Sequence, residues 1–131
     1  MKNVIFFLSL SYLFSFSALG QTFDCDRIRL DATGFKSRSS AETWYNQNIT
    51  IITDLNQKTA TFRGYTSDLW IRDDKKRMKI QFVMPMKNGP RLLFTILFLA
   101  NGEVHADVGE AGGYQSAGGA VYKCSGWDGS L

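Results

Sequence analysis

Three residues in the last third of the chain, Glu103, His105 and Asp107, carry groups that could do acid–base chemistry or bind a metal ion. They are spaced two apart, so on a β-strand all three lie on one face, with side chains about 7 Å apart along the strand. One strand spreads them too far for a compact metal site, and His105 is the only histidine. The pattern therefore favours the solvated face of a half-buried strand over a catalytic or metal site.

A glycine-rich segment, Gly109–Gly119, is the best candidate for contact with a ligand or partner. It precedes a strand, and no lysine and hydroxyl follow it, so it does not have the pattern of a phosphate-binding loop. A loop at the end of a sheet can carry binding groups, and Tyr114 offers an aromatic anchor with a hydroxyl. We predict partner contacts at Tyr114, Gln115 and Trp127, with Trp127 near the same rim. The alternative is a segment that is rich in glycine only to cross the end of the fold.

The densest basic cluster of the chain surrounds two aspartates, Asp73 and Asp74, and consists of Arg72, Lys75, Lys76, Arg77 and Lys79. Such a cluster could contact an anion or a surface polysaccharide. A charged hairpin tip that discourages pairing at a sheet edge is the simpler interpretation.

No serine of the chain stands in the strand–turn–helix context of a hydrolase nucleophile, so the serines do not support an enzyme.

The chain contains two cysteines, Cys25 and Cys124. In an oxidising compartment two such cysteines pair by default, and the bond would close a loop of nearly the whole domain. Two separate reduced cysteines are the alternative. A bond would also make the first and last strands neighbours, which favours a closed or nearly closed sheet.

The first twenty residues have the features of a secretory signal peptide. Lys2 supplies a basic start, an apolar stretch runs from Val4 to Phe16, and Ala18-Leu19-Gly20 places small residues where a signal peptidase recognises them. The apolar stretch is short and rich in serine, so an uncleaved membrane anchor is the less favoured interpretation. We expect residues 1–20 to be removed and residues 21–131 to form a single β domain, exported to the periplasm or the extracellular space.

The clearest structural signal is a hairpin over Arg91–Gly109. An apolar run and an alternating run meet at Asn101-Gly102, a dipeptide typical of hairpin turns. In the second arm Val104 faces one way and His105 the other. The first arm is apolar on both faces, which predicts a strand in the middle of the sheet that is covered on each side.

Short alternating segments separated by turn residues fill the rest of the domain. The further strands are expected at residues 23–30, 49–53, 58–63, 69–72, 77–83 and 120–125. The segment Ser37–Gln47 is compatible with a short helix, begun by a capping box at Ser39–Glu42, or with an irregular crossing. Trp44 and Tyr45 are expected to plug one end of the core. The fold class is all-β: a small antiparallel meander forming a closed or nearly closed β-barrel of about eight strands, with a β-sandwich as the alternative and at most one short helix.

The charge of the domain limits its partners. Residues 1–20 contain one basic and no acidic residue, so 14 basic and 12 acidic residues remain without them, a net charge of +2. This charge is too small to predict binding to nucleic acid or to an anionic membrane. The sequence contains no motif for a cofactor or a metal ion, and Asn48 would accept a glycan only in a eukaryotic host.

The architecture, and the placement of Cys25 and Cys124 at the two ends of the domain, resemble small periplasmic β-barrel inhibitors such as the C-type lysozyme inhibitors. No residue of an inhibitory motif is carried over to this chain. We expect a monomeric binding or inhibitor-type module, without a membrane span after signal cleavage, that contacts a protein, a glycan or a small ligand through its end loops. An envelope-associated structural protein with no discrete site and a small hydrolase are the alternatives.

Overall fold

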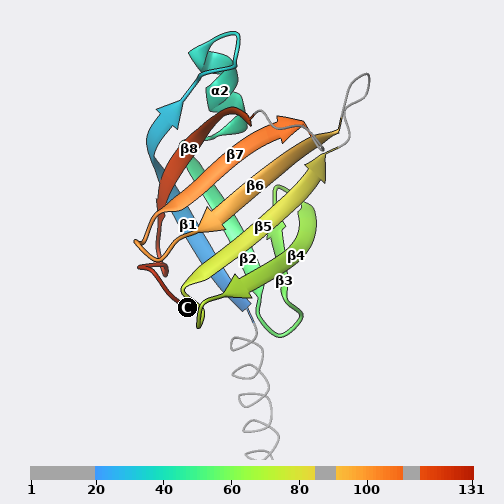
Figure 1. The fold of residues 1–131 in the computed structure, drawn as a ribbon, viewed down its shortest axis with the longest axis vertical. Coiled ribbons are helices and arrows are strands. Elements are labelled where there is room, and N and C mark those ends of the chain that lie inside the picture. The colour runs from blue at the N-terminus through green and yellow to red at the C-terminus, as the bar shows by residue number, and fades with distance from the viewer. Residues whose placement is uncertain (1–19, 85–90, 111–115) are drawn as a thin grey trace, which may run out of the picture.

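Eight β-strands form one closed barrel (Figure 1). The computed structural model describes residues 20–84, 91–110 and 116–131. Each strand is antiparallel to the next, and the last strand pairs with the first. The strands are β1 (Gly20–Asp31), β2 (Asn48–Asp54), β3 (Thr59–Phe62), β4 (Tyr65–Arg72), β5 (Arg77–Met84), β6 (Leu92–Phe98), β7 (Val104–Glu110) and β8 (Ser116–Cys124). The predicted all-β meander and closed barrel are confirmed, and the alternative β-sandwich is wrong.

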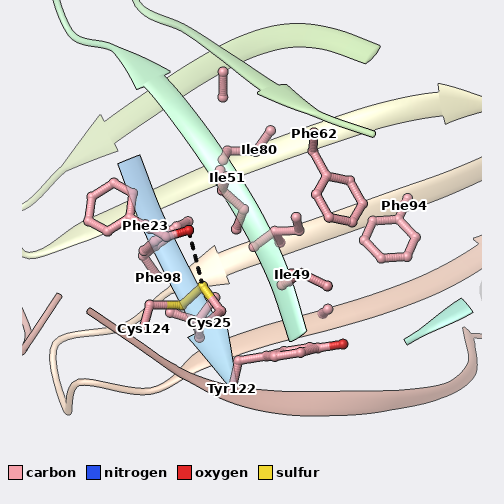
Figure 2. Close-up of a cluster of buried hydrophobic side chains, with 14 of the residues drawn as sticks. Phe23, Cys25, Ile49, Ile51, Phe62, Ile80, Phe94, Phe98, Tyr122 and Cys124 are labelled. Carbon is pink, nitrogen blue, oxygen red and sulfur yellow. Dashed lines mark hydrogen bonds between the residues drawn. A yellow bond between two sulfur atoms is a disulfide. The ribbon is translucent and has the colours of Figure 1, made fainter. Parts of the chain in front are cut away.

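The barrel closes where β1 meets β8. Cys25 lies opposite Cys124 in this strand pair, and their sulfur atoms are bonded (Figure 2). The predicted disulfide is confirmed, and it joins residues 99 positions apart across the closing seam. Strand β1 begins at Gly20, so the rest of the predicted signal peptide lies outside the described residues.

Alternate residues of the strands point into the barrel and fill it (Figure 2). Strand β5 shows the alternation clearly, since its buried residues are Met78, Ile80, Phe82 and Met84. Aromatic rings pack across the interior: Phe94 stacks on Phe62 at a centroid distance of 5.3 Å, and Phe98 packs on Phe23 at 5.1 Å. No buried side-chain nitrogen or oxygen in the described ranges lacks a hydrogen-bond partner. The interior is a packed core, so a ligand would bind on the outer wall or at an end.

A short helix, α2 (Arg38–Trp44), lies between β1 and β2 at one end of the barrel (Figure 1). Its N-cap is Ser37, whose hydroxyl accepts a hydrogen bond from a backbone amide of the first turn. The predicted cap at Ser39 is wrong because an earlier serine already satisfies that turn. Tyr45 follows the helix, is fully buried 5.9 Å from the ring of Phe94, and plugs this end of the core as predicted. Among the described residues, no helix has the length and apolar character needed to cross a membrane.

The hairpin between β6 and β7 forms as predicted. The Leu99 amide donates to the Glu103 carbonyl oxygen at 2.9 Å, and the Gly102 amide donates to the Leu99 carbonyl oxygen at 3.0 Å. Gly102 has a φ of 87°, a conformation that glycine adopts readily. The prediction that β6 is covered on both faces is wrong, since Leu97 on its outer face is 37% exposed. In a barrel of one layer only the inward face is covered, and outward apolar side chains are shielded by their neighbours alone.

Candidate functional site

A groove of about 650 Å³ crosses the outer wall of the barrel over β1, β8, β7 and β6. Its surface residues form two rows that run across the strands. Within a row, each residue is paired with a residue of the neighbouring strand. The row nearer the Gly109–Gly119 segment consists of Asp31, Gly119, Asp107 and Thr95, and the other row consists of Arg29, Val121, His105 and Leu97. The groove therefore brings acidic, basic and apolar residues together from both ends of the domain.

Gly119 forms the floor of the groove because it has no side chain. A Cβ atom at this position would lie 3.1 Å from the carbonyl oxygen of Ala106, which is closer than side chains usually come. Asp31 and Asp107 lie one strand away on either side, at a strand spacing of about 4.8 Å. The missing side chain thus leaves a slot between two aspartates.

A β-bulge in β1 turns Arg29 and Asp31 toward this groove. In the first part of the strand the odd-numbered residues, such as Cys25, face the interior. The pairing with β8 shifts between Arg27 and Arg29, so β1 contains one extra residue, Ile28. An extra residue reverses the alternation of a strand. The odd-numbered residues beyond it therefore face outward.

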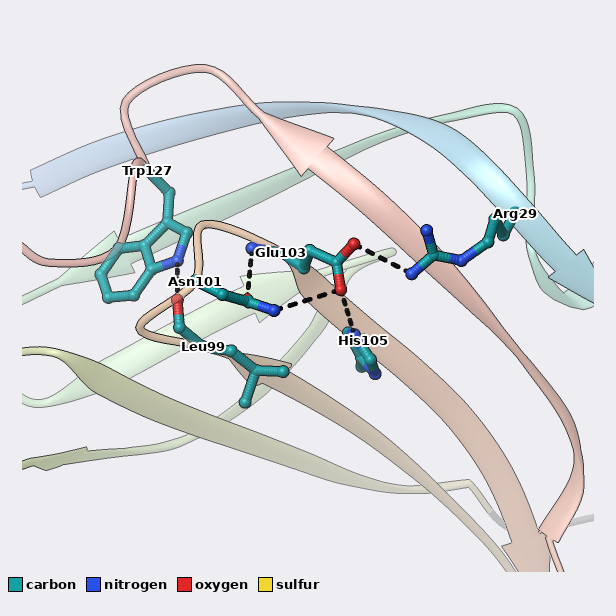
Figure 3. Close-up of polar contacts among 6 residues, drawn as sticks. All are labelled: Arg29, Leu99, Asn101, Glu103, His105 and Trp127. Atoms are coloured by element: carbon teal, nitrogen blue, oxygen red, sulfur yellow. Dashed lines mark hydrogen bonds and ion pairs between the residues drawn. The ribbon is translucent and has the colours of Figure 1, made fainter.

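The carboxylate of Glu103 contacts two residues that line the groove, Arg29 and His105 (Figure 3). Its Oε2 accepts a hydrogen bond from Arg29 Nη2 at 2.9 Å, and its Oε1 lies 3.1 Å from His105 Nε2. The side-chain amide of Asn101 donates to the same Oε1 at 3.3 Å. The hydrogen bonds from His105 and Arg29 lower the pKa of Glu103 to about 2, so this carboxylate is charged throughout the physiological range.

The two aspartates of the groove have pKa values that move in opposite directions. Burial raises the pKa of Asp107. Hydrogen bonds from the hydroxyl and the amide of Thr33 lower the pKa of Asp31. Neither aspartate forms an ion pair with another described residue, and the nearby Arg29 is bound to Glu103. Among the described residues, the negative charge at the centre of the groove therefore has no ion-pair partner.

We expect Asp107→Asn to raise the free energy of unfolding at neutral pH and to lose this advantage in acid. A raised pKa means that folding disfavours the ionised carboxylate, so charged Asp107 lowers stability above its folded-state pKa. As the pH falls through that pKa toward the ordinary value of 3.8, Asp107 is protonated and this penalty disappears. Thermal unfolding of variant and wild type at neutral pH and at about pH 3 measures the difference. A variant that is less stable at neutral pH would contradict the burial effect.

Glu103, His105 and Asp107 share one outward face, as the sequence predicts, and no nucleophile among the described residues completes a catalytic set. The carboxylate of Glu103 holds one imidazole nitrogen of His105 and so orients the ring. Within the described ranges His105 has no hydrogen bond to a serine, threonine or cysteine, and both cysteines are in the disulfide. The same ranges contain no group of three or more His, Cys, Asp or Glu residues that could hold a metal ion.

Two of the predicted contact residues, Tyr114 and Gln115, lie outside the described residues. Trp127 is described and is only 4% exposed, and its indole nitrogen donates to the Leu99 carbonyl oxygen at 2.9 Å (Figure 3). It therefore lies at the end of the barrel where β7 begins, whereas the Gly109–Gly119 segment joins the far ends of β7 and β8. The prediction that Trp127 shares a rim with this segment is wrong, because β8 runs between them along the barrel wall.

The sequence analysis missed Arg29, Asp31 and Gly119 as groove residues. The imperfect alternation of apolar residues in β1 was the only sign in the sequence of the bulge that turns Arg29 and Asp31 outward. The sign for Gly119 was its position inside the closing strand, since glycine within a strand often marks the close approach of a backbone or a ligand.

Comparison of the chain with models of protein families, with curated proteins and with solved structures finds no match. These comparisons give no support to the resemblance to the C-type lysozyme inhibitors.

Proposed function

We propose that this protein is an exported, non-enzymatic binding module that takes its ligand in the groove over β1, β8, β7 and β6. The slot at Gly119 is the observation that carries the proposal, because a strand residue without a side chain separates Asp31 from Asp107 there. Neither aspartate has a cationic partner in the part of the chain that the structure describes. Burial disfavours the charged form of Asp107, and titratable groups that are perturbed in this way are often kept for function.

The chemistry of the groove favours a ligand that is rich in hydrogen-bond donors. The carboxylates of Asp31 and Asp107 act as acceptors, and Thr95 adds a hydroxyl beside them. Leu97 and Val121 offer apolar contacts in the second row. An extended peptide or a glycan chain has both kinds of group. It also has the length to cross four strands, which span about 15 Å at the usual strand spacing.

The Gly109–Gly119 segment belongs to the same proposal. It begins and ends beside the groove, because Asp107 pairs with Gly119. Tyr114 and Gln115 within it are proposed to extend the contact with the partner beyond the groove. Export is also part of the proposal, and it is supported by the disulfide and by the signal-peptide features of residues 1–20.

Variants that remove charge from the groove test the proposal. Ligands are first identified with the wild-type protein, on a glycan array and by capture from the exported fraction of the native host. The double variant Asp31→Asn with Asp107→Asn is then expected to raise the dissociation constant of the identified ligand at least tenfold. Hydrogen bonds to charged groups contribute about 1.5–3 kcal/mol each, and about 1.4 kcal/mol corresponds to a factor of ten.

The matched control is Asp24→Asn, which removes an exposed aspartate from β1 outside the groove. This control is expected to change the dissociation constant less than about twofold. Wild-type affinity in the double variant, with both variants folded, would show that the ligand does not bind in the groove. Tyr114→Ala would then test whether the end segment alone makes the contact.

Hydrolysis of a glycan is a second candidate function, favoured by one specific observation. Asp31 and Asp107 line the same groove and their pKa values move apart, an arrangement that can provide one base and one acid. In that case the wild-type protein hydrolyses the oligosaccharides that it binds on the glycan array, and mass spectrometry detects the released products. Either single Asp→Asn variant would abolish the release and leave binding within about tenfold of the wild type.

A further inference from the structure

A second, smaller hollow of about 180 Å³ lies on the outer wall over β4, β5 and β6. Trp70 and Leu97 form its apolar walls, and they are 39% and 37% exposed. Met78, which is buried, lies at its base. Large apolar side chains that remain exposed around a concave surface are typical of a binding site.

The rim of this hollow is cationic and consists of Arg72, Arg77 and Lys79. Lys79 places its Nζ 4.9 Å from the centre of the Trp70 ring. Arg77 is ion-paired with Asp73 in the adjoining turn. Neither Arg72 nor Lys79 forms an ion pair with any residue in the described ranges. Two cationic groups at the rim are therefore available to an anion.

The wider surroundings of the hollow are also positive. The β4–β5 turn contributes Lys75 and Lys76 in addition to Asp73 and Asp74. With the rim residues included, the segment 72–79 contains five basic and two acidic side chains. This is the basic cluster seen in the sequence, and the structure places an apolar hollow beside it.

We propose that this hollow binds a small organic anion with an apolar body, such as a medium-chain fatty acid. Arg72 and Lys79 hold the oxyanion head, because guanidinium and ammonium groups form strong, charge-assisted hydrogen bonds to carboxylates, sulfates and phosphates. The apolar body lies between Trp70 and Leu97. The proposal is independent of the ligand of the larger groove, which shares only Leu97 with this hollow.

The shape and chemistry of the hollow favour a single amphiphile over two larger anionic partners. An acidic polysaccharide needs cationic groups along an extended path, whereas the cations of the rim surround one small hollow. A membrane surface is contacted by protruding apolar side chains, whereas here the apolar surface is recessed between strands. The limited volume fits a head group and a short length of chain.

Two probes with the same alkyl chain and opposite charge test the proposal on the full exported domain, below the concentrations at which they form micelles. Decanoate is expected to bind, with changes in tryptophan fluorescence and in the NMR signals of the Trp70 indole and the Leu97 and Leu99 amides. Decyltrimethylammonium is expected to bind at least about tenfold more weakly. The variant Trp70→Phe should remove the fluorescence change, which separates this ring from Trp44 and Trp127.

The double variant Arg72→Gln with Lys79→Gln is expected to weaken decanoate binding at least about tenfold. Its matched control, Lys36→Gln with Lys123→Gln, removes the same charge from exposed positions outside the hollow. The groove variant Asp107→Asn should leave decanoate binding within about twofold, because it lies outside the hollow. A failure of the larger groove as a ligand site would not alter any of these results.

Three results would overturn the proposal. Equal affinity for the two probes would mean non-specific apolar adsorption. Binding only to vesicles that contain anionic phospholipid, or only to an acidic polysaccharide, would assign the patch to one of those surfaces. NMR shifts that map away from β4–β6 would place decanoate elsewhere on the barrel.

Discussion

Replacing both cysteines, Cys25→Ala together with Cys124→Ala, is expected to lower the free energy of unfolding by about 2–5 kcal/mol. The bond closes a loop across 99 positions of the sequence, so it restricts the unfolded chain strongly. For a loop of about 100 residues the chain-entropy model gives about 4.7 kcal/mol, although a part of the effect of disulfides is enthalpic. A domain of this size has roughly 5–15 kcal/mol of stability in total. Loss of this single bond is therefore one of the largest changes that the chain can undergo.

The barrel itself should persist in this variant, because the β1–β8 ladder does not depend on the bond alone. Beyond the cysteines, Asp26 pairs with Lys123 and Leu30 with Ala120. Alanine leaves neither a free thiol nor a buried hydroxyl. We therefore expect a native circular dichroism spectrum and a lower midpoint of urea unfolding.

Reduction provides the control for the cysteine variant. Dithiothreitol should lower the urea midpoint of the wild type toward that of the variant and leave the variant unchanged. Thiol labelling of the denatured, non-reduced wild type should find no free sulfhydryl. Full labelling at both positions, or a variant as stable as the wild type, would contradict a closing role for the bond.

The interior of the barrel could be predicted from the sequence because the side chains of a strand alternate with a period of two residues. In β5 this places Met78, Ile80 and Phe82 inside, as found. The two cysteines at the ends of the domain added the long-range information that strand patterns lack, namely that β1 and β8 are neighbours.

The limits of the strands were less predictable. Strand β4 begins at Tyr65, whereas the strand expected from the sequence covers only residues 69–72. Thr61 pairs with Thr66 and Thr59 with Asp68, so pairing with β3 keeps this polar segment in the sheet. Such pairing is a tertiary effect that overrides local propensity.

The groove could not be predicted because it depends on register. One extra residue at Ile28 decides that Arg29 and Asp31 face outward, and only the pairing with β8 reveals it. Gly119 becomes a floor only because Asp31 and Asp107 lie on the strands to either side. The acidic and basic residues were visible in the sequence, but their neighbours were not.

Phe98→Ala is expected to lower the free energy of unfolding by about 3–5 kcal/mol, a large part of the roughly 5–15 kcal/mol that stabilises a typical domain. The ring is fully buried, with centroids 5.1 Å from Phe23 and 5.4 Å from Trp127. These partners come from the first strand and from beyond the last, so the cavity would open where both ends of the domain meet the central hairpin. Urea unfolding measures the loss, and Phe98→Leu, which refills most of the volume, should recover a large part of it.

The neighbouring residue supplies the matched control, because Leu97 lies on the outer face of the same strand and is 37% exposed. Leu97→Ala is expected to cost less than about 1 kcal/mol, and His105→Ala, opposite it on β7, less than about 0.5 kcal/mol. The contrast between two adjacent residues of β6 tests the alternation of the hairpin directly. If Leu97→Ala were the more damaging change, the inward and outward faces of β6 would be exchanged. Leu97 and its partner His105 would then lie inside the barrel, and neither the groove nor the smaller hollow could exist on its outer wall.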